Sequence, residues 1–173
     1  MTPAVFFDRD GTLMEEVHYC ADPALVKVYP GVPEALRKLK NAGFRLFVVS
    51  NQSGIARGLL TLEQYHAVEQ EFLRQIGPHL IDASYFCADP PGLPSPRRKP
   101  APGMLLEAAA AFAIDLPRSW LVGDKAADIE CGRRAGTRTI LVATGYGSQQ
   151  NCAPHFHAQN VVDAAAIILH ELY

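Results

Sequence analysis

Five short apolar runs recur along the chain, and each has the length and composition of a buried β-strand. Unbroken apolar runs of this kind are typical of strands that are covered on both faces, as in a parallel sheet. The pattern therefore predicts strands over Ala4–Phe7, Arg45–Ser50, Ala83–Cys87, Ser119–Val122 and Arg138–Val142.

Helical spacing fills most of the intervals between these strands. Apolar residues at i, i+3, i+4 and i+7 predict a helix over Val32–Ala42, and a capping box at Thr61 and Gln64 opens another that runs to Ile76. Alternating strands and helices imply right-handed crossovers. We therefore expect an α/β fold, a Rossmann-like three-layer sandwich with a mostly parallel central sheet. Further helices are predicted over Pro102–Phe112, Asp124–Ala135 and about Asp163–Leu172.

Length and composition narrow the class of protein. A chain of 173 residues with 49% hydrophobic and 20% charged residues predicts one globular domain over residues 1–173. A net charge of -2 gives no general attraction to nucleic acid or to anionic membranes, so we expect neither as a partner. Four scattered cysteines and an N-terminus without a basic, apolar leader predict a cytoplasmic protein.

Two carboxylates, Asp8 and Asp10, follow the first predicted strand one residue apart. At about 4 Å they would repel by roughly 4 kcal/mol at an effective dielectric near 20. A cation or a shared proton would relieve that repulsion, whereas the simpler interpretation is a polar turn. An EF-hand loop is excluded, because Leu13 and Tyr19 stand where it needs glycine and glutamate.

Polar clusters also follow three of the later strands. They comprise Ser50–Gly54, Arg97–Pro100 and Gly123–Lys125, the last with Asp128 one turn beyond. In a parallel sheet these strand ends lie at one edge, which is where ligands bind. Four such clusters in succession favour a functional site over chance.

Phosphoryl transfer through an aspartyl-phosphate needs this set of groups. Asp8 is the candidate nucleophile, Asp10 the candidate acid and base, and Asp124 a further oxygen ligand for Mg²⁺. Ser50 and Lys99 are candidates for binding the phosphoryl oxygens and offsetting their charge.

Each of these residues also has a structural interpretation. Ser50 could cap a turn, Lys99 could be a solvated cation, and Asp124 could cap a helix. Asp128 could orient Lys99 or only stabilise the first turn of its own helix.

Four segments together resemble the motifs of the haloacid dehalogenase (HAD) superfamily of phosphatases: F-F-D-R-D-G-T, S-N-Q-S-G-I-A-R-G, R-K-P-A-P-G-M and V-G-D-K-A-A-D. The residues of these motifs are most similar to those of the D-glycero-D-manno-heptose 1,7-bisphosphate 7-phosphatases and the histidinol-phosphate phosphatases. The resemblance covers Phe6 to about Gly147 and implies a HAD-like core. No segment after the first or third strand is long enough for a separate cap domain.

The resemblance also implies roles for individual residues. Mg²⁺ would be held by Asp8, the backbone carbonyl of Asp10, and Asp124. Asp8, Asp10, Ser50 and Lys99 would be catalytic. The implied substrate contacts are Glu16, Val17, His18, Tyr19, Asn51, Gln52, Ser53, Arg57, Arg98 and Lys125.

One part of the chain departs from the family pattern. Relatives usually carry a structural zinc in the loop before R-K-P; here only Cys87 is kept, and Asp89, Ser95 and Arg97 stand at the other three positions. One thiolate cannot make a closed tetrahedral zinc site, so we expect no structural zinc. A second loose cluster, Cys152, His155 and His157, is interpreted as a surface loop.

These observations predict a Mg²⁺-dependent phosphomonoesterase. The expected substrate is D-glycero-D-manno-heptose 1,7-bisphosphate, losing its 7-phosphate, or a similar small phosphorylated metabolite such as another sugar bisphosphate. Histidinol phosphate is the alternative, with a polynucleotide 3′-phosphatase or a catalytically silent phosphometabolite-binding module less favoured.

Overall fold

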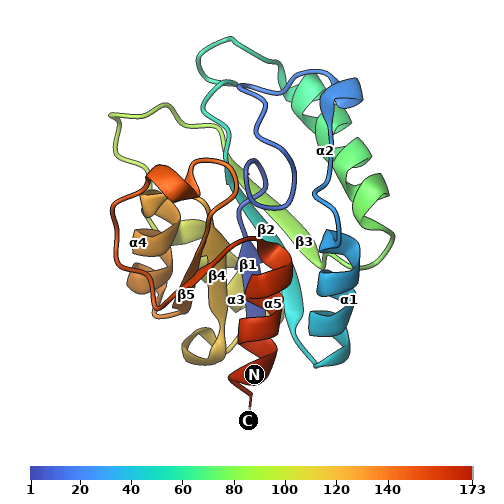
Figure 1. Ribbon diagram of the computed structural model, residues 1–173. Helices are drawn as coiled ribbons and strands as arrows, with labels where there is room; N and C mark the ends of the chain where they lie inside the picture. The colour runs from blue at the N-terminus through green and yellow to red at the C-terminus, as the bar shows by residue number, and fades with distance from the viewer. Residues whose placement is uncertain (173) are drawn as a thin grey trace.

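The computed structural model describes residues 1–172, which form a six-stranded parallel sheet between two layers of helices (Figure 1). The strand order is β3-β2-β1-β4-β5-β6, and every neighbouring pair is parallel. All five predicted strands are confirmed to within one residue, and β6 is an addition. The strands are β1 (Ala4–Phe7), β2 (Arg45–Asn51), β3 (Ala83–Cys87), β4 (Trp120–Gly123), β5 (Arg138–Val142) and β6 (Phe156–Ala158).

The predicted helices are present, with ends that shift by one or two residues. The capping box is confirmed, because the Thr61 hydroxyl accepts from the Gln64 N–H at 3.1 Å and the Gln64 side chain accepts from the Thr61 N–H at 2.8 Å. The α-helices are α1 (Val32–Asn41), α2 (Leu62–Ile76), α3 (Gly103–Phe112), α4 (Ala126–Ala135) and α5 (Val161–His170). Short 3-10 turns lie at Pro23–Leu25, Leu116–Arg118 and Gly147–Gln149.

The start of α4 corrects the sequence prediction. The helix was expected from Asp124, but it begins at Ala126 with Lys125 as its N-cap residue. The side chain that satisfies the free N–H of Lys125 is Asp128, at 3.1 Å. Asp124 is therefore not the helix cap, and its carboxylate is available for another role.

Alternate side chains of each central strand enter two separate cores. Val5 and Phe7 of β1 pack in the core beneath α1, α2 and α5, whereas Ala4 and Phe6 pack in the core beneath α3 and α4. All four side chains are fully buried. This explains why the strands read as unbroken apolar runs rather than as an alternation.

The centre of the sheet is a topological switch point. From β1 the chain first builds the side that holds β2 and β3, and then returns to place β4 on the other side of β1. Loops after β1 and β4 therefore leave the sheet in different directions and open a crevice between them. The Asp8 N–H donates to the Val122 carbonyl at 3.0 Å, so Asp8 lies at the point where β1 and β4 separate.

The segment with Cys152, His155 and His157 is not entirely a loop, because residues Phe156–Ala158 form β6 on the edge of the sheet beside β5. His155 is engaged by Thr139, whose hydroxyl lies 2.9 Å from the ring Nδ1. This corrects the interpretation of that segment as a surface loop. Within residues 1–172, no helix has the length and apolarity needed to cross a bilayer.

Candidate active site

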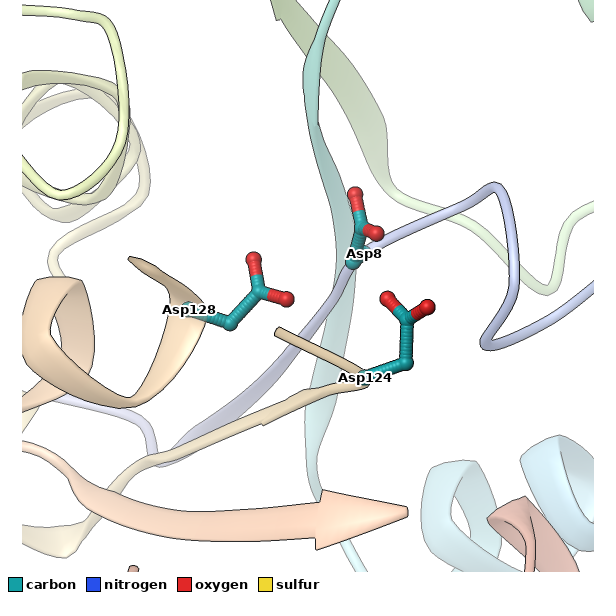
Figure 2. A group of neighbouring side chains, drawn as sticks. All are labelled: Asp8, Asp124 and Asp128. Atoms are coloured by element: carbon teal, nitrogen blue, oxygen red, sulfur yellow. The ribbon is translucent and has the colours of Figure 1, made fainter. Parts of the chain in front are cut away.

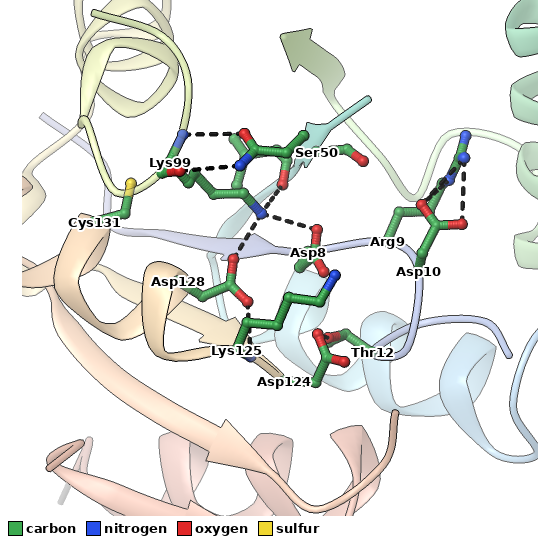
Figure 3. Close-up of polar contacts among 12 residues, drawn as sticks. Asp8, Arg9, Asp10, Thr12, Ser50, Lys99, Asp124, Lys125, Asp128 and Cys131 are labelled. Carbon is green, nitrogen blue, oxygen red and sulfur yellow. Dashed lines mark hydrogen bonds and ion pairs between the residues drawn. The ribbon is translucent and has the colours of Figure 1, made fainter. Parts of the chain in front are cut away.

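Asp8 and Lys99 form the centre of the site at the carboxyl edge of the sheet. The Lys99 ammonium lies 2.8 Å from Asp8 Oδ1, 2.6 Å from Asp128 Oδ1 and 2.8 Å from the Val49 carbonyl (Figure 3). Burial would lower the pKa of Lys99, but Asp128 and Asp8 outweigh burial and raise it. Lys99 is therefore a permanent buried cation beside the Asp8 carboxylate, and not a solvated loop residue.

Asn51 holds the backbone of Lys99 in place. Its side-chain amide donates to the Lys99 carbonyl and its side-chain oxygen accepts from the Lys99 N–H, both at 3.0 Å. These two bonds attach the proline-rich loop to the end of β2. Asn51, expected to contact substrate, therefore uses both ends of its amide to position Lys99.

Asp128 serves both of the roles that the sequence left open. One carboxylate oxygen pairs with Lys99 and the other accepts from the Lys125 N–H at the start of α4. Burial raises the pKa of Asp128, and Lys99 opposes that rise. The carboxylate thus aims Lys99 and stabilises the helix at the same time.

Asp124 is completely buried beside Asp8. Its carboxylate accepts from the Tyr146 N–H at 2.9 Å, and Thr12 lies 3.5 Å away. Burial and the neighbouring Asp8 raise the pKa of Asp124 to about 8. Gly11 and Gly145 pass so close, both at positive φ, that a Cβ on either would collide with this carboxylate. The backbone here is shaped to admit one acidic side chain.

Asp8, Asp124 and Asp128 converge on one small volume (Figure 2). One oxygen from each lies within 4.8 Å of the others, and all three residues are buried. Carboxylate oxygens in this arrangement suit Mg²⁺, which would also relieve the repulsion that raises the pKa of Asp124. Both oxygens of Asp128 are already engaged, one by the Lys99 ammonium and the other by the Lys125 N–H, whereas Asp8 pairs with Lys99 through Oδ1 alone. Asp8 and Asp124 are therefore the side chains best placed to hold the ion.

The carboxylate of Asp10 points away from this cluster and toward Arg9 (Figure 3). The Arg9 guanidinium lies 3.2 Å from Asp10 and 2.9 Å from Glu69 of α2, and it is almost fully buried. Gln52 donates from one amide nitrogen to Asp10 at 2.9 Å and to Ser50 at 2.7 Å. If Asp10 contacts a metal ion in this arrangement, it would do so through its backbone carbonyl. No pattern in the sequence signals the links to Arg9 and Glu69.

A pocket of about 320 Å³ opens over Asp8 and Asp10. Every predicted substrate contact except Arg57 lines it. Ser50, predicted to be catalytic, is not in the lining but accepts a hydrogen bond from Gln52, which is. Its walls hold Asp8, Asp10, Glu16, Val17, His18, Tyr19, Cys20, Asn51, Gln52, Ser53, Arg98, Lys99, Lys125, Ala127, Asp128 and Tyr146.

Besides Lys99 and Asp128, two further charged residues of the pocket wall have shifted pKa values. Burial and Asp10 raise the pKa of Glu16, and its Oε2 atom is buried without a hydrogen-bond partner within the described residues. Burial would lower the pKa of Lys125, but Asp8 and Asp124 outweigh it and raise the pKa. The pocket thus offers a hydrogen-bond acceptor and a cation near the buried acids.

Tyr146 is a pocket residue that sequence reasoning missed. It follows β5 in the segment T-G-Y-G, which is another polar cluster at a strand end. Its ring lies 5.1 Å from the Lys125 ammonium, and its hydroxyl lies 3.1 Å from His18 Nε2. The position of this segment after the fifth strand was the available signal.

The altered loop is held by hydrogen bonds. Cys87 donates to Asp89 at 3.4 Å, and the Ser95 hydroxyl donates to the same carboxylate at 2.6 Å. The hydrogen bonds from Ser95 and Cys87 lower the pKa of Asp89. The Arg97 side chain instead pairs with Glu107 at 2.8 Å. That no zinc binds here stays a prediction.

Comparisons with known proteins agree on one kind of enzyme. The family model for HAD-hydrolase-like proteins matches residues 96–166. A D-glycero-D-manno-heptose-1,7-bisphosphate 7-phosphatase of Thermosynechococcus vestitus is 41% identical over 172 residues, covering 90% of this chain and 86% of the relative. A D-glycero-beta-D-manno-heptose-1,7-bisphosphate 7-phosphatase of Escherichia coli K12 is 38% identical, covering 83% of this chain and 80% of the relative.

Solved structures extend the likeness to the whole fold. The D,D-heptose 1,7-bisphosphate phosphatase of B. bronchiseptica, complexed with magnesium and phosphate, aligns with a TM-score of 0.88 and 27% identity, over 98% of this chain and 99% of its own. A HAD-like phosphatase of Mesorhizobium loti aligns with a TM-score of 0.81 and 34% identity, over 96% of this chain and 86% of its own.

Proposed function

Because the chain belongs to the HAD-like hydrolases and is a phosphoric monoester hydrolase, we propose that it removes a phosphate from a small sugar phosphate through an aspartyl-phosphate on Asp8. The observation that carries this proposal is the pairing of Asp8 with Lys99 at 2.8 Å inside the pocket. A buried carboxylate that is oriented by a fixed cation, and that also faces the pocket, is suited to nucleophilic attack.

In the first step an oxygen of Asp8 attacks phosphorus while the bond from phosphorus to the leaving oxygen breaks. The leaving oxygen takes a proton from Asp10, so the sugar leaves with a hydroxyl group and an acyl-phosphate remains on Asp8. In the second step Asp10 removes a proton from water, and the water oxygen attacks phosphorus while the bond from phosphorus to the Asp8 oxygen breaks. The products are inorganic phosphate and the free Asp8 carboxylate. Asp10 must leave its contacts with Arg9 and Gln52 to do this.

The remaining residues stabilise charge during both steps. Lys99 neutralises charge that develops on the phosphoryl oxygens, and Ser50 can donate to one of them, since Gln52 already donates to its hydroxyl. Asp8, Asp124 and the backbone carbonyl of Asp10 would hold Mg²⁺. That ion would offset the repulsion between the Asp8 carboxylate and an incoming phosphate dianion.

We infer that the substrate is D-glycero-D-manno-heptose 1,7-bisphosphate and that its 7-phosphate is lost. Relatives named for this activity at 34–43% identity support the inference. The pocket supports it as well, because Arg98 and Lys125 lie in its wall, where they could bind a second phosphate.

The test is release of inorganic phosphate by purified protein, with and without Mg²⁺, from heptose 1,7-bisphosphate (both anomers), histidinol phosphate and a 3′-phosphorylated oligonucleotide. We expect Mg²⁺-dependent release, fastest from a heptose bisphosphate. Asp8→Asn should lower kcat by at least about 10³-fold with an unchanged circular dichroism spectrum, since the nucleophile is lost. A fully active Asp8→Asn protein would exclude Asp8 as nucleophile, and a preference for histidinol phosphate would exclude the proposed substrate.

A further inference from the structure

The segment 16–19, called the strap below, lies across the centre of the site. At one end Arg57, in the loop after β2, donates to the Tyr19 hydroxyl and stacks 5.4 Å from its ring. The preceding residue, His18, meets the hydroxyl of Tyr146, in the loop after β5. Because β1 and β4 lie between β2 and β5, the strap bridges the strand ends that carry Asp8 and Asp124.

The Tyr19 end of the strap is held in an unfavourable backbone conformation. Tyr19 has a φ of 50°, in the left-handed region that side chains other than glycine seldom adopt. Its ring packs against Gly54, where a Cβ would lie 2.6 Å from Tyr19 Cδ1. A conformation of this kind persists only where surrounding contacts impose it, and the contacts here are those with Arg57 and Gly54.

Tyr146 supports the strap at His18, the residue next to Tyr19. Its backbone N–H donates to Asp124, its ring lies against the Lys125 ammonium, and its hydroxyl meets His18. One residue therefore connects the strap to the buried acidic cluster. Nothing in the reaction itself requires the Tyr146 hydroxyl.

The strap also places an unsatisfied acceptor in the pocket. Glu16 Oε2 is buried without a hydrogen-bond partner within residues 1–172, and Glu16 lines the pocket. A buried acceptor is costly to leave unpaired. A substrate hydroxyl is the donor that would satisfy it, whereas a substrate without hydroxyls would leave it unpaired.

We propose that Tyr146 and Arg57 are specificity-determining residues, which act by fixing the strap so that Glu16 receives a hydroxyl of the substrate. Tyr146 and Arg57, called the two tethers, hold a wall of the pocket at the place where a polyhydroxylated leaving group must lie. This rests on the proposed function in one respect, that the leaving group is a sugar. Arg57, predicted from the sequence to contact substrate, then acts through Tyr19.

The test compares Tyr146→Phe with Tyr85→Phe as a matched control. Tyr146→Phe keeps the ring beside Lys125 and the N–H to Asp124, and removes only the contact with His18. Tyr85 lies on β3 away from the pocket and packs against Phe47 at 6.4 Å. For each protein, kcat and KM are measured with heptose 1,7-bisphosphate and with p-nitrophenyl phosphate, whose leaving group has no aliphatic hydroxyls.

Tyr146→Phe should raise KM for heptose 1,7-bisphosphate about fivefold, the effect of one hydrogen bond, with a change below about twofold for p-nitrophenyl phosphate. Arg57→Gln should do the same, and Tyr85→Phe should change neither substrate. Equal rises for both substrates, or none, would overturn the proposal.

Amide hydrogen exchange gives a readout that does not depend on activity. Exchange of residues 16–19 should accelerate in Tyr146→Phe and in Arg57→Gln, and exchange in α5 should not change. Unchanged exchange in the strap would contradict the claim that Tyr146 and Arg57 hold it in place. If wild-type protein handled heptose bisphosphate no better than p-nitrophenyl phosphate, the proposed substrate would fail, and exchange alone would then decide whether the tethers hold the strap.

Discussion

At the scale of single residues, two side chains of the pocket wall also hold other residues of the candidate site in place. Asn51 holds Lys99 by two bonds, and Gln52 connects Ser50 to Asp10. Both were expected to contact substrate. Residue type and spacing identify a polar cluster at a strand end, but they do not distinguish a group that binds a ligand from one that orients its neighbour.

Asp128 offers a direct test of such an orienting residue. In Asp128→Asn, Lys99 keeps only Asp8 as a charged partner, so the pair should tighten and hold the nucleophile more firmly. We expect kcat to fall at least about tenfold while KM changes little, as measured by phosphate release.

The control for that variant is Asp163→Asn. Asp163 occupies the same third position of α5 and also accepts a backbone N–H, from Gln159 at 3.3 Å, but it lies away from the pocket. Asp163→Asn should reproduce any loss of kcat that comes only from weakening the start of a helix. If both variants lost kcat equally, Asp128 would have only a structural role.

At the scale of elements, periodicity and apolar runs located every α-helix and five of the six strands that residues 1–172 form. β6 escaped because it has only three residues, of which His157 is exposed, and such a strand leaves no apolar run to detect. The start of α4 was misplaced because aspartate is a common N-cap, and no local signal shows that Asp124 faces a buried acidic cluster instead.

Asp82 joins three elements at the opposite edge of the sheet. Its carboxylate accepts from Lys40 at the end of α1 at 2.6 Å, from Arg45 of β2 at 2.7 Å, and from the Leu46 N–H at 2.8 Å. Burial would raise the pKa of Asp82, but the bonds from Lys40, Leu46 and Arg45 outweigh it and lower the pKa. A lowered carboxyl pKa stabilises the fold above the unfolded value of 3.8, and that stability is lost as the pH falls through the folded pKa.

Asp82→Asn should therefore lower the free energy of unfolding by about 1–3 kcal/mol at pH 7, as measured by urea denaturation. The difference from wild type should shrink below about pH 4, where the carboxyl of the unfolded chain is protonated. Asp115→Asn is the control, since that side chain is only partly buried and lies away from these contacts. A difference that did not change with pH would contradict the assigned charge.

At the scale of the whole molecule, the acidic cluster makes stability depend on metal and on pH. Asp124 has its pKa raised to about 8 from an unfolded value of 3.8. A raised carboxyl pKa means that the folded state binds the proton more tightly, so the contribution of Asp124 to stability is largest at low pH and is lost as the pH rises from about 4 to about 8. This dependence has the opposite sign to that of Asp82.

In thermal melts in EDTA, Asp124→Asn should therefore have a higher Tm than wild type at pH 8. The difference in Tm should become smaller as the pH is lowered toward 5. Asparagine can still accept from the Tyr146 N–H but adds no charge beside Asp8. Added Mg²⁺ should raise the Tm of wild type more than that of the variant, because the ion binds the folded acidic site. Parallel melting curves for the two proteins at all pH values would contradict this account.

Finally, every strand of the sheet runs in the same direction, and the pocket is lined by residues that follow the carboxyl ends of the strands. The residues before β1 and the end of α5 both lie at the opposite edge of the sheet, where β1 begins (Figure 1). An affinity tag, a fusion partner or a link to a solid support at either end would leave the pocket open to diffusing substrate. For the same reason, a linker between the two described ends in a circular permutant would not need to cross the catalytic edge.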